Sequence, residues 1–290
     1  MTTPTLAGGD GTGPDLHAEM RKAAAVLAGT PGRSGTASGG GRPVTSDLSI
    51  DESLLLHSVG WEPVDLVCGV AVVSVPSGVW NWGQGEIGAA SAAQTAAFEG
   101  ALARLADEGG RAGARGVVGV RVDVSVHRHH IDVELVGTAV RPVAAKRSTE
   151  VFVSDLSGRD FALLQRAGWS PVGLAHGASF VYAPRRSAGT SLRQTGANVE
   201  LTNYTEAMYS ARELAMERMQ TTALKVRGTG IVAVKIIEGP MPFAGHSIGF
   251  AAWGTAVGLE GEGHRGIEPQ VILPLDDAVV QFAAESLRGD

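Results

Sequence analysis

The chain has 290 residues, of which 44% are hydrophobic and 19% are charged, and its formal net charge is −6. This composition predicts a folded, core-forming protein of about two domains. The negative net charge and the lack of a run of arginine and lysine argue against a nucleic-acid partner. A single cysteine excludes an intrachain disulfide framework. Because neither a secretory signal nor an apolar stretch of membrane-spanning length is evident, we expect a soluble, cytoplasmic protein.

The first 45 residues form a region of their own. Apolar residues at helical spacing in Asp15–Leu27 predict a short helix. The following stretch, Gly29–Gly41, consists mostly of glycine, serine and threonine, which is typical of a flexible linker. We therefore expect residues 1–45 to contain an N-terminal helix and a Gly/Ser-rich linker.

Two copies of one pattern occupy most of the remaining chain. The pattern begins with Ser-Asp-Leu-Ser, continues through Gly-Trp-x-Pro-Val and an alanine-rich segment, and ends with Gly-Thr-Ala-Val. The matched blocks are 46–49 and 154–157, 60–69 and 168–177, 97–104 and 211–218, 116–120 and 230–234, and 137–140 and 254–257. The spacing between blocks differs between the copies, as expected when loops change length and cores do not.

Each copy opens with a predicted short helix. In the first copy, Ser49 and Glu52 have the spacing of a capping box, and the helix that they open should end at Gly60. In the second copy, Ser157 and Asp160 offer the same arrangement. The repeat therefore extends to the capping residues and is not confined to apolar positions.

Strands and one long helix follow in each copy. Branched and aromatic residues predict strands at Val70–Val75 and Ala178–Tyr182. Helical spacing and high alanine content predict long helices at about 86–108 and 200–224. Two further strands close each copy. In Val120–Val126 valine alternates with polar residues, so that one face of the strand should pack against the long helix.

The predicted fold class is therefore α+β. It is a tandem repeat of two small β-β-α-β-β units, at residues 46–145 and 146–262, each with a short leading helix. Residues 263–290 follow as a C-terminal helical tail, in which Asp276–Leu287 is the expected helix.

Several of these blocks resemble the YbjQ family, also known as the heavy-metal-binding domain family. The resemblance lies in the alanine-rich helix, in Ala-Arg-Gly-Val-Val-Gly-Val-Arg at 114–121, and in the Gly-Thr-Ala-Val ending. It extends from about Ser46 to Leu259 in two copies, as in tandem actinobacterial members. The resemblance implies a small α+β fold that assembles into rings, pentameric in single-domain members, with no established enzymatic activity. It assigns no metal ligand to any residue.

A repeat without a catalytic motif predicts a non-enzymatic, self-assembling binding or scaffold protein whose ligand the sequence does not identify. We find no nucleophile elbow, phosphate loop or dinucleotide fingerprint in a suitable context. We expect a homo-oligomer such as a pentameric ring, and another protein is a possible further partner. Two fused units can occupy two places in one ring, stack as two layers, or pair within one chain. An enzyme with its site between subunits is one alternative.

A histidine cluster supports a second alternative, a metal-binding protein. His127, His129 and His130 precede Asp132 and Glu134 near the predicted turn between two strands, and His127 and His129 would share one strand face. Imidazole and carboxylate groups are ordinary ligands of zinc, nickel and copper. These five residues are the candidate ligands of a divalent transition metal. A solvated polar turn is the structural alternative, because short histidine-rich tracts are a compositional signal.

Two other features have mainly structural interpretations. Cys68, which stands where the second copy has His176, is expected to be a buried small hydrophobe and not a reactive thiol. A Cys/His metal site that joins these two positions is the alternative. Glu99 and Glu213 occupy matching helix positions, where solvated surface pairing is more usual than general-base chemistry.

The tryptophans divide into two groups. Trp61 and Trp169 have matched surroundings in the two copies, and we expect both in the core. Trp80 and Trp82 lie in the first predicted hairpin loop, where they either form an exposed apolar patch for a partner or fold back over the sheet.

Overall fold

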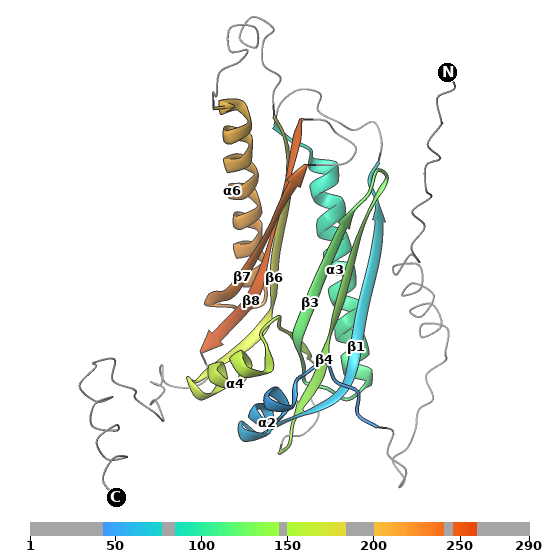
Figure 1. The fold of residues 1–290 in the computed structure, drawn as a ribbon, viewed down its shortest axis with the longest axis vertical. Coiled ribbons are helices and arrows are strands. Elements are labelled where there is room, and N and C mark those ends of the chain that lie inside the picture. The colour runs from blue at the N-terminus through green and yellow to red at the C-terminus, as the bar shows by residue number, and fades with distance from the viewer. Residues whose placement is uncertain (1–42, 77–84, 145–149, 184–199, 241–245, 260–290) are drawn as a thin grey trace, which may run out of the picture. The chain divides into compact units, whose positions relative to one another are not determined.

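The structure, a computed structural model, describes residues 43–76, 85–144, 150–183, 200–240 and 246–259. The predicted terminal helices, Asp15–Leu27 and Asp276–Leu287, lie outside these residues, as do Trp80 and Trp82. In the described part of the chain the fold is α+β, as the sequence predicts, with its strands in two sheets (Figure 1).

Two halves with similar element order follow each other along the chain. The first contains α2 (Ile50–Ser58), β1 (Trp61–Ser74), β2 (Gly85–Glu86), α3 (Gly88–Arg111), β3 (Gly116–Val126) and β4 (His130–Pro142). The second contains β5 (Phe152–Val153), α4 (Gly158–Arg166), β6 (Trp169–Tyr182), α6 (Thr202–Lys225), β7 (Gly230–Pro240) and β8 (Ser247–Leu259). Strands β1 and β6 begin at the tryptophan of each copy, so they are longer than the branched residues alone predict.

The leading helices α2 and α4 begin as their sequences predict. Ser49 and Glu52 form a complete capping box, in which each side chain accepts a hydrogen bond from the other residue's backbone N–H. The Ser157 hydroxyl accepts the backbone N–H of Asp160 at the start of α4. Gly60 and Gly168, at φ +78° and +81°, then reverse the chain into β1 and β6, a conformation that favours glycine.

Each half has its own, mainly antiparallel sheet, which its long helix covers. The strand order is β1-β4-β3-β5 in the first sheet and β2-β6-β8-β7 in the second. Helix α3 packs on β1 and β4, and α6 packs on β6 and β8 (Figure 1). Both sheets contain a bulge at the equivalent place, between Val118 and Arg121 in β3 and between Val232 and Lys235 in β7.

Two short strands cross between the halves. Strand β2 of the first half pairs with the outer edge of β6, where Glu86 lies opposite Val181. Strand β5 of the second half pairs in parallel with the outer edge of β3, where Val117 lies opposite Val153. Each half therefore completes the sheet of the other, which no pattern in these two-residue strands predicts.

A close approach of helix to strand recurs in both halves and explains one repeated glycine. A Cβ atom at Gly69 would lie 2.2 Å from the carbonyl oxygen of Ala101, and one at Gly177 would lie 2.0 Å from that of Ala215. One turn along each helix, an arginine donates to a strand carbonyl. The Nη1 of Arg104 lies 2.8 Å from the Val70 oxygen, and that of Arg218 lies 2.7 Å from the Ala178 oxygen.

The main apolar core continues across the junction of the halves. It contains buried residues of α3, β1, β3 and β4 together with four residues of the second half, Val153, Leu174, Phe180 and Trp253. A smaller cluster joins Leu56 and Val118 of the first half to Phe161 of α4. The halves thus share buried side chains as well as strand hydrogen bonds.

The expectation that Trp61 and Trp169 are core residues is wrong in degree, because both are only half-buried. Trp61 instead packs edge-on against Phe152 and Phe161, with ring centroids 5.7 and 5.3 Å away. It therefore serves the contact between the halves. Among the described helices, none has the length and apolarity needed to cross a membrane.

Candidate functional site

Three of the predicted metal ligands gather at the tip of the β3–β4 hairpin. The backbone N–H of His127 donates to the carbonyl of His130 at 2.9 Å, which closes the hairpin and stacks the two imidazoles with ring centroids 4.5 Å apart. Both rings point at Asp132. The Nε2 atom of His127 lies 3.1 Å from Asp132 Oδ2, and that of His130 lies 3.4 Å from Asp132 Oδ1.

The geometry of this group suits a divalent metal. The ligand atoms of His127, His130 and Asp132 all lie within 4.8 Å of one another, and Asp132 Oδ1 has no hydrogen-bond partner. His127 is exposed and the other two are half-buried, so an ion can enter from solvent. Two imidazoles and one carboxylate leave the fourth position of a tetrahedral site for water.

The other two predicted ligands lie outside this group. His129 is exposed at the turn, where its carbonyl accepts the backbone N–H of Val75 at 2.8 Å. Glu134 lies along β4, opposite Val70 in β1 and Asp123 in β3. The negative charge of its carboxylate helps to raise the pKa of the Cys68 thiol.

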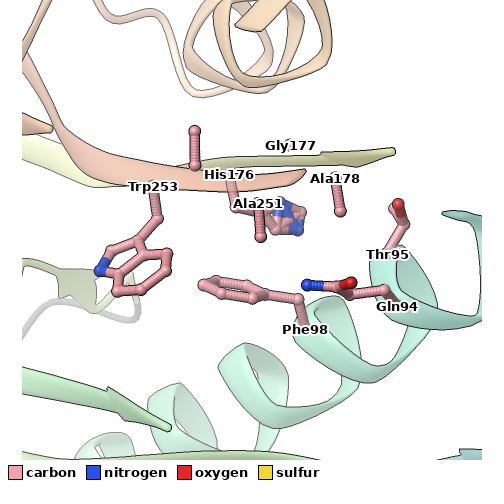
Figure 2. Close-up of a pocket in the computed structure, with 9 residues that line it drawn as sticks. Gln94, Thr95, Phe98, His176, Gly177, Ala178, Ala251 and Trp253 are labelled. Carbon is pink, nitrogen blue, oxygen red and sulfur yellow. The ribbon is translucent and has the colours of Figure 1, made fainter. Parts of the chain in front are cut away.

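A second location of interest is a buried pocket between the halves. His176 on β6 and Trp253 on β8 project toward α3, where Phe98 and Gln94 face them (Figure 2). The imidazole of His176 meets the Phe98 ring edge-on at 4.3 Å. The cavity among these residues has a volume of only about 10 Å³, which is room for at most one water molecule.

Three buried nitrogen atoms of this pocket are unusual because they lack hydrogen-bond partners. Both ring nitrogens of His176 and the indole nitrogen of Trp253 are buried without a hydrogen bond. Burial, and secondarily the positive charge of Lys225, lower the pKa of His176 from 6.5 to about 4. The imidazole is therefore neutral at physiological pH, and the pocket serves packing between the halves.

A wider groove opens beside this pocket, between α3 and α6. Its volume is about 370 Å³, within the range of small-molecule sites. It is lined by Glu99 of α3 and by Glu217, Arg218 and Lys225 of α6. Glu99 is exposed there and Glu213 is exposed elsewhere on α6, as expected for solvated surface carboxylates. The charged groups of the groove are of both signs.

An ion pair closes one side of the junction, and sequence reasoning did not find it. The Glu86 carboxylate binds the Arg218 guanidinium through two contacts of 2.5 and 2.9 Å. Burial alone would raise the pKa of Glu86, but the hydrogen bonds from Arg218 and Ser91 and the charge of Arg218 hold it below its ordinary value. The only signal in the sequence was the return of Arg104 as Arg218.

Cys68 is half-buried on β1, and its surroundings disfavour reactivity. Its backbone N–H donates to a Glu108 carboxylate oxygen at 2.8 Å. Burial, followed by the negative charges of Glu108 and Glu134, raises the pKa of the Cys68 thiol. A thiolate is therefore scarce at neutral pH. Cys68 and His176 are not among the described residues that gather as metal ligands.

Comparison with known proteins identifies the family. Residues 186–260, which include α6, β7 and β8, match the model of the YbjQ family described as "Putative heavy-metal-binding". With a relative that is 39% identical over 243 residues, this match shows that the chain belongs to the YbjQ-like family. That relative is the encapsulin nanocompartment protein Rv1762c of Mycobacterium tuberculosis, and the alignment covers 80% of this chain and 92% of the relative. No solved structure matches the chain.

Proposed function

We propose that this chain is a non-enzymatic, self-assembling scaffold or binding protein. In this proposal, two YbjQ-like units at 46–145 and 146–262 act together in a cytoplasmic homo-oligomeric ring. The observation that carries it is the junction between the halves, where β2 and β5 each extend the other half's sheet and a shared core is buried. Edge-strand addition is a general way for a folded unit to recruit another unit.

The relative supports the same proposal from a different direction. Its name concerns an encapsulin nanocompartment, which is a protein assembly. By analogy with that relative, this chain too belongs to a larger protein assembly in our proposal. Because the alignment covers 92% of the relative, we infer that the two proteins share a mode of assembly.

Native mass spectrometry of untagged protein, purified without chelator, tests the proposal. We expect one discrete oligomer of the 29.8 kDa chain at micromolar concentration, and size-exclusion chromatography with light scattering should give the same mass. A single chain as the main species at that concentration would contradict the proposal. So would turnover of a substrate in the groove between α3 and α6.

The histidine cluster supports a second candidate function, binding of a divalent transition metal. The observation in its favour is the convergence of His127, His130 and Asp132, whose ligand atoms lie within 4.8 Å of one another. Two imidazoles and a carboxylate are the donor set that zinc, nickel and copper accept.

Titration calorimetry with Zn²⁺ and Ni²⁺ tests this second function. We expect one ion per chain, and a loss of affinity of at least tenfold in His127→Ala and in His130→Ala, because each removes one ligand. His129→Ala is the matched control, since His129 belongs to the same turn but lies outside the group. Equal losses in all three variants would point to a nonspecific polar turn.

A further inference from the structure

The junction inside the chain can be compared, position by position, with the outer surfaces of the two halves. In the junction, α3 of the first half covers β6 of the second, while β5 and α4 of the second half cover β3 of the first. The repeat defines the equivalent positions, namely β1 for β6, α6 for α3, β7 for β3 and α2 for α4. Among the described residues, no strand pairs with the outer edge of β1 or of β7.

Positions of the first half that correspond to buried junction residues are apolar and exposed. Leu174 and Phe180 on β6 are each 3% exposed beneath α3, whereas the equivalent residues of β1, Leu66 and Val72, are 37% and 62% exposed. Ala162 of α4 is 1% exposed, whereas its equivalent on α2, Leu54, is 64% exposed. Leu54, Leu66 and Val72, together with the exposed Val44 before α2, are called the first-half face.

The second half shows the complementary set of exposed positions. Val120 on β3 is 1% exposed, whereas its equivalent on β7, Val234, is 39% exposed. Gln94 of α3 is 3% exposed, whereas its equivalent on α6, Met208, is 40% exposed. Met208, Val234 and the neighbouring exposed Ile236 are called the second-half face.

Backbone geometry gives independent support for docking on β7. In β3 the bulge residue Gly119 has φ +65°, and its N–H donates to the carbonyl of Leu156, while Val120 N–H donates to that of Ser154. In β7 the bulge residue Ala233 has φ +54°, which is strained for a residue with a side chain. The second half thus keeps the docking geometry of β3, although no described segment occupies it.

We propose that the second-half face of one chain binds the first-half face of a second copy, in the way that the two halves bind each other within one chain. Residues 44–48 of the incoming copy lie along β7, as residues 152–156 lie along β3. Its β1 lies under α6, as β6 lies under α3. This inference rests on the proposed self-assembly and specifies its contact.

The two faces are different surfaces, so the contact is heterologous. A repeated head-to-tail contact generates a closed ring when the rotation that relates successive units completes a full turn. Each chain then fills two successive places, and the fused junction and the contact between chains alternate around the ring. This selects the first of the three arrangements open from the sequence.

A charge-swap experiment on the full chain tests this contact. Gln94 and Phe180 line one cavity in the junction, so their equivalents, Met208 and Val72, should meet between chains. We expect Val72→Lys alone and Met208→Glu alone to lower the mass in light scattering to that of one chain. The double variant should restore the wild-type mass, because its Lys and Glu face each other across the contact. Leu224→Lys is the matched control, since Leu224 is 73% exposed and its equivalent Gly110 also remains exposed.

The outcomes separate this inference from the proposed function. If both single variants keep the oligomeric mass of the wild type, the proposed contact is wrong, but the proposed self-assembly still holds. A double variant that stays dissociated also overturns the contact. A wild type that is a single chain overturns both. Slower amide exchange at Ala233 and Val234 in the wild type than in Val72→Lys would support strand docking on β7.

Discussion

Replacing Gly177 with alanine is expected to lower the free energy of unfolding by about 3 kcal/mol, at the upper end of overpacking changes. The added Cβ would lie 2.0 Å from the Ala215 carbonyl oxygen and 2.5 Å from the Met219 nitrogen. Both are backbone atoms of α6, so no side-chain rotation relieves the overlap and the helix must move away from β6. Gly69→Ala should behave alike, because its Cβ would lie 2.2 Å from the Ala101 oxygen.

Urea denaturation followed by circular dichroism measures both effects. The midpoint should fall while the slope with denaturant stays unchanged, which is the signature of a change in stability alone. Gly88→Ala, at the start of α3, is the control, since nothing lies within 4 Å of a Cβ there. Ordinary surface substitutions change the free energy of unfolding by up to about 0.5 kcal/mol. If Gly177→Ala changes it by no more than that, the close approach of α6 to β6 does not constrain this position.

Acidification is expected to destabilise the protein through His176. The pKa of this residue is 6.5 in the unfolded chain and about 4 in the folded protein, so the unfolded state binds the proton more readily. The stability that this residue contributes is therefore full above pH 6.5 and is lost as the pH falls toward 4. At about 1.4 kcal/mol per pKa unit, the loss over this range is about 3 kcal/mol.

His176→Leu tests the source of this pH dependence. We expect the variant to lose less stability than the wild type between pH 6.5 and 4, the window set by the two pKa values. At pH 7 it should be as stable or about 1 kcal/mol more stable, because the imidazole nitrogens that it removes have no partners. His129→Gln changes an exposed histidine and should keep the wild-type pH profile. An unchanged profile in His176→Leu would place the acid sensitivity elsewhere.

Local sequence signals predict the elements of this fold well. The capping residues Ser49 and Ser157 begin α2 and α4 as expected, and the alanine-rich segments form α3 and α6 close to their predicted bounds. These signals are local, because a cap or an amphipathic pattern is set by neighbours along the chain. The α+β class follows from them directly.

The contacts between the halves were beyond such reasoning. Strands β2 and β5 have two residues each, too few for any periodicity, and each is defined by the edge that it joins. The half-buried state of Trp61 has the same origin, because its partners Phe152 and Phe161 come from the other half. A repeat reveals equivalent positions, but it does not reveal which of them are covered.

The histidine cluster lies between these two cases. The sequence predicts that ligands gather at the hairpin, and alternation along a strand pairs His127 with His129. In the structure the hydrogen bond from His127 to His130 closes the turn, so residues three apart face each other. The membership of the cluster depends on this turn geometry, which spacing alone does not define.

Because the buried core is shared across the junction, we expect the whole described region to unfold as one cooperative unit, although the sequence repeats. Leu174, Phe180 and Trp253 belong to the same buried cluster as the residues of α3 and β1, so a half that unfolds alone exposes apolar surface of the other. Repeat proteins with weak junctions lose their units one at a time. Here the two copies have diverged in their side chains, but we expect them to fold and unfold together.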